Sequence, residues 1–291
     1  MELTNTFVFC PIIPTFIEKA LTTLYTFTPP NFRVILIDQT FDGMKQYVGD
    51  ERVHLYLRPY RNLGFAQSMN TGIRLSTTPY VTVANDDIEF INSRWWEGIE
   101  ETFAQDPNIK AVNPQSVTEP GWGYGCNRNS DPELIAQKEV ELKARFNLDT
   151  QHFEHLPYKE KYTEADYDFL RAKKAGLCDG IITWMTVFDR QALELKGVFD
   201  ERFCPGGGED YDINGRFYST HWPNEDSPRY RMVATSRSWV WHHLSSSRSF
   251  KGQILPTLRP GFGDDHAMWQ DKWPHPTMAK YRIGQVERYS L

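Results

Sequence analysis

The sequence predicts an α/β protein with a mostly parallel, doubly wound sheet and helices on both of its faces. Segments whose apolar residues recur at helical spacing alternate with apolar, β-branched runs, at residues 6–10, 33–38 and 80–84. Such strand–helix alternation is typical of parallel sheets. Two of these runs end directly in acids, at Asp38 and at Asp86-Asp87. Because open α/β sheets bind ligands at the carboxyl ends of their strands, we expect the functional site at this edge.

The connections in the first half carry signals for helix starts. The helix after the first strand is expected to begin with a capping box, in which Thr15 and Glu18 each satisfy a backbone amide. A third strand is predicted at residues 53–57, and the turn Asn62-Leu63-Gly64 opens the next helix. Asn70 interrupts the apolar stripe of that helix, so we expect its amide to have a buried partner.

Further elements follow along the chain. We expect a helix with Ser93 as its N-cap, and later strands and a short helix at residues 109–112, 179–188, 213–218 and 232–241. Residues 119–175 are rich in glycine and aromatic residues at first and strongly charged later, with an exposed helix expected at 132–146. This segment has too few apolar residues for a core of its own, so it is interpreted as an insertion over the sheet edge.

Composition narrows the class of protein. The chain has 291 residues and a net charge of −6, which disfavours bulk binding of nucleic acid. Its four cysteines include no C-x-x-C pair, so we expect free thiols in a reducing compartment. The apolar segment at 7–13 is too short and too interrupted by proline to span a bilayer. We therefore expect a cytoplasmic protein, and peripheral contact with a membrane stays open.

The strand-end acids have two readings. Asp87 fits a hard divalent cation, Mg²⁺ or Mn²⁺, whose remaining ligands a nucleoside diphosphate supplies, and His242 or His243 would add an imidazole. Asp38 would accept hydrogen bonds from a base or a ribose. The alternative is that both acidic segments only form turns, which Asn and Asp favour. For the histidines, the alternative is a structural hydrogen bond.

A glycine-rich loop at 206–208 precedes Glu209 and Asp210. Such a loop lets the backbone approach a ligand closely and holds a carboxylate at the mouth of a site. Asp210 would then remove the proton from an attacking hydroxyl as a general base. Its alternative role is the N-cap of the short helix that follows. The chain has no G-x-x-x-x-G-K-[ST] loop, no G-x-G-x-x-G that opens a helix and no G-x-S-x-G elbow.

In their order along the chain, these motifs resemble the family 2 glycosyltransferases of the GT-A fold. The resemblance covers roughly residues 5 to 250, which makes it more specific than a single motif. It is carried by Asn62-x-Gly64, Asn70-x-Gly72-Ile73, Asn85-Asp86-Asp87, Gly197-Val198-Phe199-Asp200-Glu201-Arg202-Phe203, Gly208-Glu209-Asp210-Tyr211-Asp212-x-x-x-Arg216, the strand that ends at His242, and Lys272-Trp273. One departure is Asn85, where many members of the family carry Asp.

The resemblance implies an inverting transferase that uses a divalent metal, Mn²⁺ or Mg²⁺, and a nucleotide-diphospho-sugar such as a UDP-, GDP- or dTDP-sugar. By it, Asp87 and His242 bind the metal, and Asp210 with Glu209 forms the catalytic pair. The donor site would contain Asp38, Asn62, Gly64, Asn70, Asn85 and Asp86. The catalytic domain would span residues 1–250, with a nucleotide-sugar half at 1–118, the insertion at 119–175 and an acceptor half at 176–250. Residues 251–291 would form an irregular extension packed on it.

The chemistry of the residues agrees with this reading. A single base without a second carboxylate nucleophile predicts inversion at the anomeric carbon. Trp95, Trp122 and Trp184 are candidates to stack on sugar rings, with core packing as the alternative. Two other classes compete: a nucleotidyltransferase of the sugar-nucleotide pyrophosphorylase type, and a non-enzymatic sugar-nucleotide-binding protein. The acceptor stays open among a glycan, a lipid-linked sugar, a protein, a small molecule and a modified nucleobase.

Overall fold

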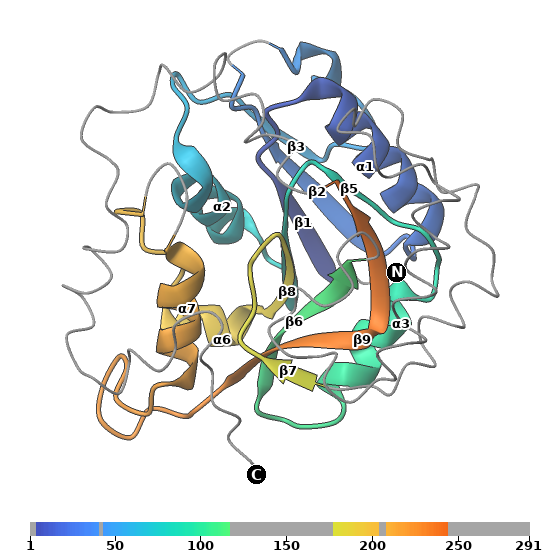
Figure 1. The fold of residues 1–291 in the computed structure, drawn as a ribbon. Helices are drawn as coiled ribbons and strands as arrows, with labels where there is room; N and C mark the ends of the chain where they lie inside the picture. The colour runs from blue at the N-terminus through green and yellow to red at the C-terminus, as the bar shows by residue number, and fades with distance from the viewer. Residues whose placement is uncertain (1–3, 41–42, 117–176, 204–207, 244–291) are drawn as a thin grey trace.

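The structure is a computed structural model that describes residues 4–40, 43–116, 177–203 and 208–243 (Figure 1). The predicted insertion at 119–175 with its helix at 132–146, the first two glycines of the loop at 206–208, and the extension at 251–291 lie outside the described residues. No helix in the described ranges has the length and apolar character needed to cross a membrane.

The described part of the chain contains a nine-stranded sheet in the order β3-β2-β1-β4-β8-β6-β9-β5, with β7 also paired to β9. The strands are β1 (Asn5–Phe9), β2 (Phe32–Ile37), β3 (Leu55–Leu57), β4 (Tyr80–Ala84), β5 (Ile88–Glu89), β6 (Ile109–Ser116), β7 (Leu177–Asp179), β8 (Met185–Asp189) and β9 (Arg231–His242). β1 to β4 pair in parallel, as do β6 and β9, whereas β5, β7 and β8 run antiparallel to their neighbours. The predicted mostly parallel sheet is confirmed.

Helices cover both faces of this sheet, as the sequence predicted (Figure 1). They are α1 (Pro14–Phe27), α2 (Gly64–Leu75), α3 (Trp95–Phe103), α6 (Arg190–Lys196) and α7 (Glu209–Tyr218), with a short 3₁₀ turn at Lys45–Tyr47. Because side chains alternate along a strand, Phe7 and Phe9 of β1 pack with α1 and α3 in one core. Val8 packs with α2, α6 and α7 in the second core, on the opposite face.

Two predicted helix caps are wrong. Helix α1 begins at Pro14, after Ile13, without a side-chain cap, because Pro has no N–H and suits the first helical position. The predicted capping box of Thr15 and Glu18 does not form, and Glu18 instead binds Arg52. Helix α3 begins after Arg94 rather than after Ser93, and the side chain of Asn92 accepts a bond from the Arg94 amide at 2.8 Å.

Two later elements also differ from expectation. The segment predicted as one strand at 179–188 is two strands, β7 and β8, separated by residues 180–184, the first of which, Gly180, has a φ of +86°. Helix α7 begins at Glu209 after Gly208, which has a φ of 86°, so the predicted N-cap role of Asp210 is wrong. Helix α6 was not predicted; Asp189 caps it by accepting a bond from the amide of Ala192.

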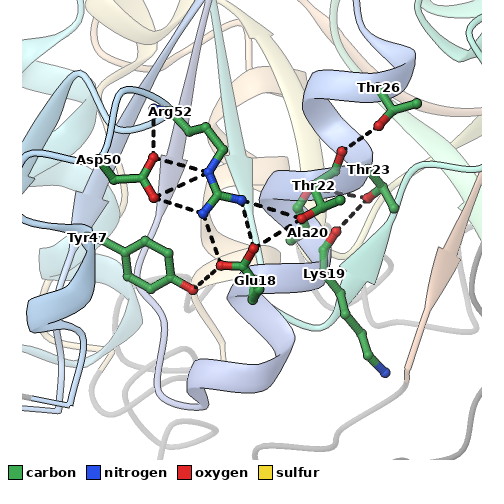
Figure 2. A network of polar contacts seen from close by, with 9 residues as sticks. All are labelled: Glu18, Lys19, Ala20, Thr22, Thr23, Thr26, Tyr47, Asp50 and Arg52. Atoms are coloured by element: carbon green, nitrogen blue, oxygen red, sulfur yellow. Dashed lines mark hydrogen bonds and ion pairs between the residues drawn. The ribbon is translucent and has the colours of Figure 1, made fainter.

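An ion-pair network ties α1 to the segment before β3. Figure 2 shows the Arg52 guanidinium between the carboxylates of Glu18 and Asp50, with the Tyr47 hydroxyl also on Glu18. The closest Arg52 contacts are 2.7 Å to Glu18 and 2.8 Å to Asp50. Hydrogen bonds from Arg52 lower the pKa of both carboxyls. The network therefore fixes helix α1 against the segment before β3, the strand at one edge of the sheet.

The last strand bends at a bulge that determines where it ends. In the register of β6 and β9, Pro114 faces Thr235 and Gln115 faces Trp239, so the residues between them on β9 have no partner on β6. Figure 1 shows β9 turning sharply beside α3. Gly98 of α3 packs on this bulge, and a Cβ atom there would lie 2.2 Å from the Arg237 carbonyl oxygen. Beyond the bend, His242 pairs with Ile88 of β5.

Gly98→Ala should therefore destabilise the protein, because a methyl group would force α3 away from the backbone of β9. We expect a loss of about 1–3 kcal/mol in the free energy of unfolding, measured by chemical denaturation. Glu97→Ala, on an exposed position of the same helix, is the control and should change stability by less than about 0.5 kcal/mol. Equal stability of the two variants would show that α3 does not need this close approach.

Arg52→Gln should remove a stabilisation that depends on pH. The lowered pKa values of Glu18 and Asp50 mean that the network stabilises the folded state above their ordinary values and loses this effect as the pH falls through about 4.5 and below. The side chain of Glu18 is half exposed, so we expect a cost of about 1 kcal/mol at pH 7, shrinking toward pH 3. Urea denaturation at both pH values measures it, with Lys19→Gln as the control. A cost that is the same at both pH values would rule out the carboxyl groups as its source.

Candidate active site

The end of β4 carries two neighbouring carboxylates that point to different partners. Asp86 is buried, and its Oδ2 accepts hydrogen bonds from the amides of Ile12 at 2.9 Å and Ile13 at 3.0 Å. These amides lie between β1 and α1, so Asp86 fixes the turn that leads into the first helix. Burial, followed by the charge of Asp87, raises the pKa of Asp86 to about 7. Two buried like charges side by side are costly unless a proton or a cation compensates them.

Asp87 faces the end of β9. Its Oδ1 lies 3.3 Å from Nε2 of His242, and its backbone carbonyl accepts a bond of 2.8 Å from the amide of His243. The imidazole of His243 lies elsewhere, with Nε2 at 2.8 Å from Oε1 of buried Glu89. Successive residues of an extended strand point to opposite sides, which explains the divergence. The geometry thus brings Asp87 together with His242, the histidine that the family resemblance implies.

The pair of Asp87 and His242 fits a divalent cation by its donor atoms and their spacing. Carboxylate oxygen and imidazole nitrogen are ligands that Mn²⁺ accepts. Two ligands at right angles, each about 2.1 Å from one ion, would lie about 3 Å apart, close to the separation observed. In the described part of the chain, no group of three or more His, Cys, Asp or Glu side chains could hold a metal. A cation bound here would need further oxygen ligands from the substrate.

Asp210 lies in the first turn of α7, opposite a loop from the sheet. Its Oδ1 accepts hydrogen bonds from the amide of Thr183, at 2.9 Å, and from the Thr183 hydroxyl. Glu209, the first residue of the helix, is buried. In the same turn, buried Asp212 pairs with Nε of Arg216 at 3.0 Å, which fixes the helix from within. Asp210 is thus the acid of α7 that contacts the segment of residues 180–184.

Other predicted donor residues hold turns. Asp38 follows β2 and is buried; Thr40 donates to its Oδ1 through both its amide and its hydroxyl, and the Tyr56 hydroxyl donates to Oδ2 at 2.6 Å. This is the turn role given above as the alternative for Asp38. Asn62 accepts a bond of 2.8 Å from the amide of Gly64, whose φ of 74° suits glycine.

Asn70 and Asn85 differ in their surroundings. Asn70 is buried in α2, donates to the Phe199 carbonyl at 2.8 Å and to Glu201 at 2.9 Å, and accepts from the Phe199 amide at 2.9 Å. The predicted buried partner is therefore confirmed, and the bond ties α2 to the segment before α7. Asn85 is only partly buried, and its backbone amide donates to the Trp184 carbonyl at 2.8 Å. A role of either side chain in donor binding stays a prediction.

The loop of residues 180–184, between β7 and β8, was missed as a functional element. Its indole, Trp184, stacks on the His242 ring with 4.7 Å between centroids and 10° between planes, and its Thr183 holds Asp210. The sequence offered two signals here: Trp184 as a candidate to stack on a sugar ring, and Gly180 inside an apparent strand, which often marks a break. Of the other candidate stacking residues, Trp95 is fully buried in the core and Trp122 lies outside the described residues.

Comparison with known proteins gives one family. The family model described as glycosyl transferase family 2 matches residues 11–164, more than half of the chain. No curated protein matches the sequence.

Solved structures share the fold at low sequence identity. A mannosyltransferase, PcManGT from Pyrobaculum calidifontis, solved with GDP-mannose and Mn²⁺, is similar at a TM-score of 0.52 and 16% identity, over 100% of this chain and 77% of that one. GalNAc-T7, solved with UDP, GalNAc and Mn²⁺, is similar at a TM-score of 0.55 and 14% identity, over 83% of this chain and 43% of that one. This chain thus matches less than half the length of GalNAc-T7. The predicted GT-A fold is confirmed. Because the family model matches more than half of its residues, and its fold agrees, the chain belongs to the family 2 glycosyltransferases.

Proposed function

We propose that this glycosyltransferase moves a sugar from a nucleotide-diphospho-sugar to an acceptor hydroxyl, with inversion and with the help of a divalent metal. The observation that carries the proposal is the 3.3 Å approach of Asp87 Oδ1 and His242 Nε2 at the carboxyl end of β4. The structures with Mn²⁺ and nucleotides in two proteins of the same fold support it. Mn²⁺ or Mg²⁺ suits the donor set.

The departure of the nucleoside diphosphate requires compensation of its growing negative charge. A cation held by Asp87 and His242 would supply this as a Lewis acid when bound. In this proposal Asp86 does not bind the cation, because its Oδ2 accepts hydrogen bonds from the turn before α1. Instead it fixes the position of its neighbour Asp87. Asn85, partly exposed at the same strand end, is the nearest candidate for a contact with the donor sugar or ribose.

The acceptor hydroxyl needs a base as it attacks the anomeric carbon. We assign this role to Asp210, whose carboxylate would take the proton while the acceptor oxygen forms the new bond and the bond to phosphate breaks. Thr183 holds that carboxylate through its Oδ1. Attack from the side opposite the leaving group inverts the anomeric centre. Asp38, Asn62, Gly64 and Asn70 shape the surrounding donor site in this proposal, and Glu209 supports the first turn of α7.

The alternative of a nucleotidyltransferase loses support from the turn after β1. Such an enzyme would want free backbone amides there to hold phosphates. The amides of Ile12 and Ile13 are instead bonded to Asp86. The acceptor class and the predicted cytoplasmic location stay predictions. Hydrolysis of a panel of UDP-, GDP- and dTDP-sugars, followed as nucleoside diphosphate release, identifies the donor without an acceptor.

Asp87→Asn should abolish stabilisation by a nucleoside diphosphate that depends on Mn²⁺, because the cation loses its carboxylate. In the wild-type chain, ligand at about 100 times its Kd should stabilise the fold by about 2.7 kcal/mol, read as a rise in Tm. Glu51→Gln, which removes an exposed carboxylate away from this strand end, should keep the full shift. A metal-dependent shift that survives in Asp87→Asn would remove Asp87 from the metal site.

Asp210→Asn should separate binding from turnover. An amide cannot take the acceptor proton, so kcat for donor hydrolysis should fall by about 10²–10⁴-fold. The Mn²⁺-dependent thermal shift with the nucleoside diphosphate should stay near that of the wild type. The anomeric configuration of the released sugar, read at once by NMR, tests inversion. Near-normal turnover of the variant would assign the base to another residue.

A further inference from the structure

Each of the five residues between β7 and β8 is held by a different contact. We call residues 180–184 the central loop. The Gly180 amide donates to the Met232 carbonyl at 2.9 Å, and Ile181 exchanges two hydrogen bonds with the side chain of Asn214. The Ile182 carbonyl accepts a hydrogen bond from the Asn113 side chain at 2.5 Å. Thr183 donates to the Asp210 carboxylate, and the Trp184 carbonyl accepts from the Asn85 amide at 2.8 Å. These partners come from β9, α7, β6 and the end of β4. The central loop is thus fixed by elements on both sides of the site.

Its last two residues contact the two functional groups proposed above. Thr183 binds the Asp210 carboxylate, and the next residue, Trp184, lies flat against His242. One short segment therefore spans from the proposed base to the proposed metal ligand. The two groups belong to α7 and β9, and the central loop contacts both, so it fixes their positions relative to one another.

The stack of Trp184 on His242 restricts the rotation of the imidazole ring about χ2, which the backbone does not fix. Rotation of an imidazole about χ2 is broad, so a strand alone does not fix the direction of Nε2. The indole lies 10° from parallel with the ring at 4.7 Å, which restricts that rotation. In this orientation Nε2 lies 3.3 Å from Asp87 Oδ1. Contacts of this kind, behind a metal ligand, commonly tune metal affinity.

We propose that the central loop aligns the two halves of the site, with Trp184 as the positioning residue for His242 and Thr183 as the positioning residue for Asp210. The inference rests on the proposed function, because it takes Asp87 with His242 as metal ligands and Asp210 as the base. Neither Trp184 nor Thr183 need touch the substrate in this role. Trp184 also packs at the margin of one core, so a purely structural role is the competing explanation.

Trp184 is tested by metal affinity rather than by turnover. Mn²⁺ binding is followed by electron paramagnetic resonance in the presence of UDP or GDP, whichever stabilises the wild-type chain with Mn²⁺. Trp184→Leu should weaken Mn²⁺ binding about 10–100-fold, and Trp184→Phe, which keeps a flat ring, should restore most of it. Trp222→Leu is the matched control: this tryptophan is also partly buried, contacts Lys196, and should leave Mn²⁺ affinity unchanged.

Thr183 is tested by the division between binding and turnover. Thr183→Val removes the hydroxyl donor to Asp210 but keeps the amide donor, so kcat for donor hydrolysis should fall about 10-fold or more with unchanged Mn²⁺ affinity and KM. Thr183→Ser, which keeps the hydroxyl, should recover kcat. A structural role alone would instead lower Tm in both Thr183→Val and Trp184→Leu while leaving Mn²⁺ affinity and kcat near the wild type.

The outcomes separate the inference from the function on which it rests. If Asp87→Asn loses Mn²⁺ binding and Trp184→Leu does not, the positioning role of Trp184 is wrong and the metal site stands. If Asp210→Asn loses turnover and Thr183→Val does not, the positioning role of Thr183 is wrong and the base stands. If the wild-type chain itself binds no Mn²⁺ with any nucleoside diphosphate, both the metal-assisted function and the inference drawn from it fail.

Discussion

Two adjacent carboxylates at the buried end of β4 are the constraint on which the site depends. Their mutual repulsion and the loss of water are tolerable only if each finds its own compensation. Asp86 finds it in two backbone amides before α1, and Asp87 faces His242 at the end of β9. The bonds from the two amides to Asp86 fix where the first helix starts relative to β4. The contact of Asp87 with His242 requires that a strand from the far end of the chain arrive beside β5.

The strands were predictable because their signal is local. Apolar, β-branched runs mark β1, β2 and β4, and the acids that end them mark the functional edge. The helix starts were less predictable, because Thr15 and Ser93 fit the capping pattern while α1 and α3 start at Pro14 and Trp95. Patterns of residues name candidates for a cap but do not show which backbone amides lack a partner.

The site was predictable in its acids and not in what holds them. Asp87, Asp210 and His242 stand out as polar groups at element ends, whereas Thr183 and Trp184 lie in a segment that reads as strand. Their partners, Asp210 and His242, are far away in the sequence, so no spacing rule links them. Asp38 shows the converse: an acid in the expected place whose two oxygens both serve Thr40 and Tyr56.

The bulge of β9 has a consequence for how this strand can change over evolution. The bulge determines which side of the strand each of the last residues faces, because a shift of one position turns every following side chain to the other side. An insertion of one residue between Thr235 and Trp239 that shifts the following strand would put Trp241 in the place of His242, and a deletion would put His243 there. Either change would leave one of the two acids, Asp87 or Glu89, without a histidine partner. Length in this short stretch is therefore constrained as strictly as the identity of the ligands themselves.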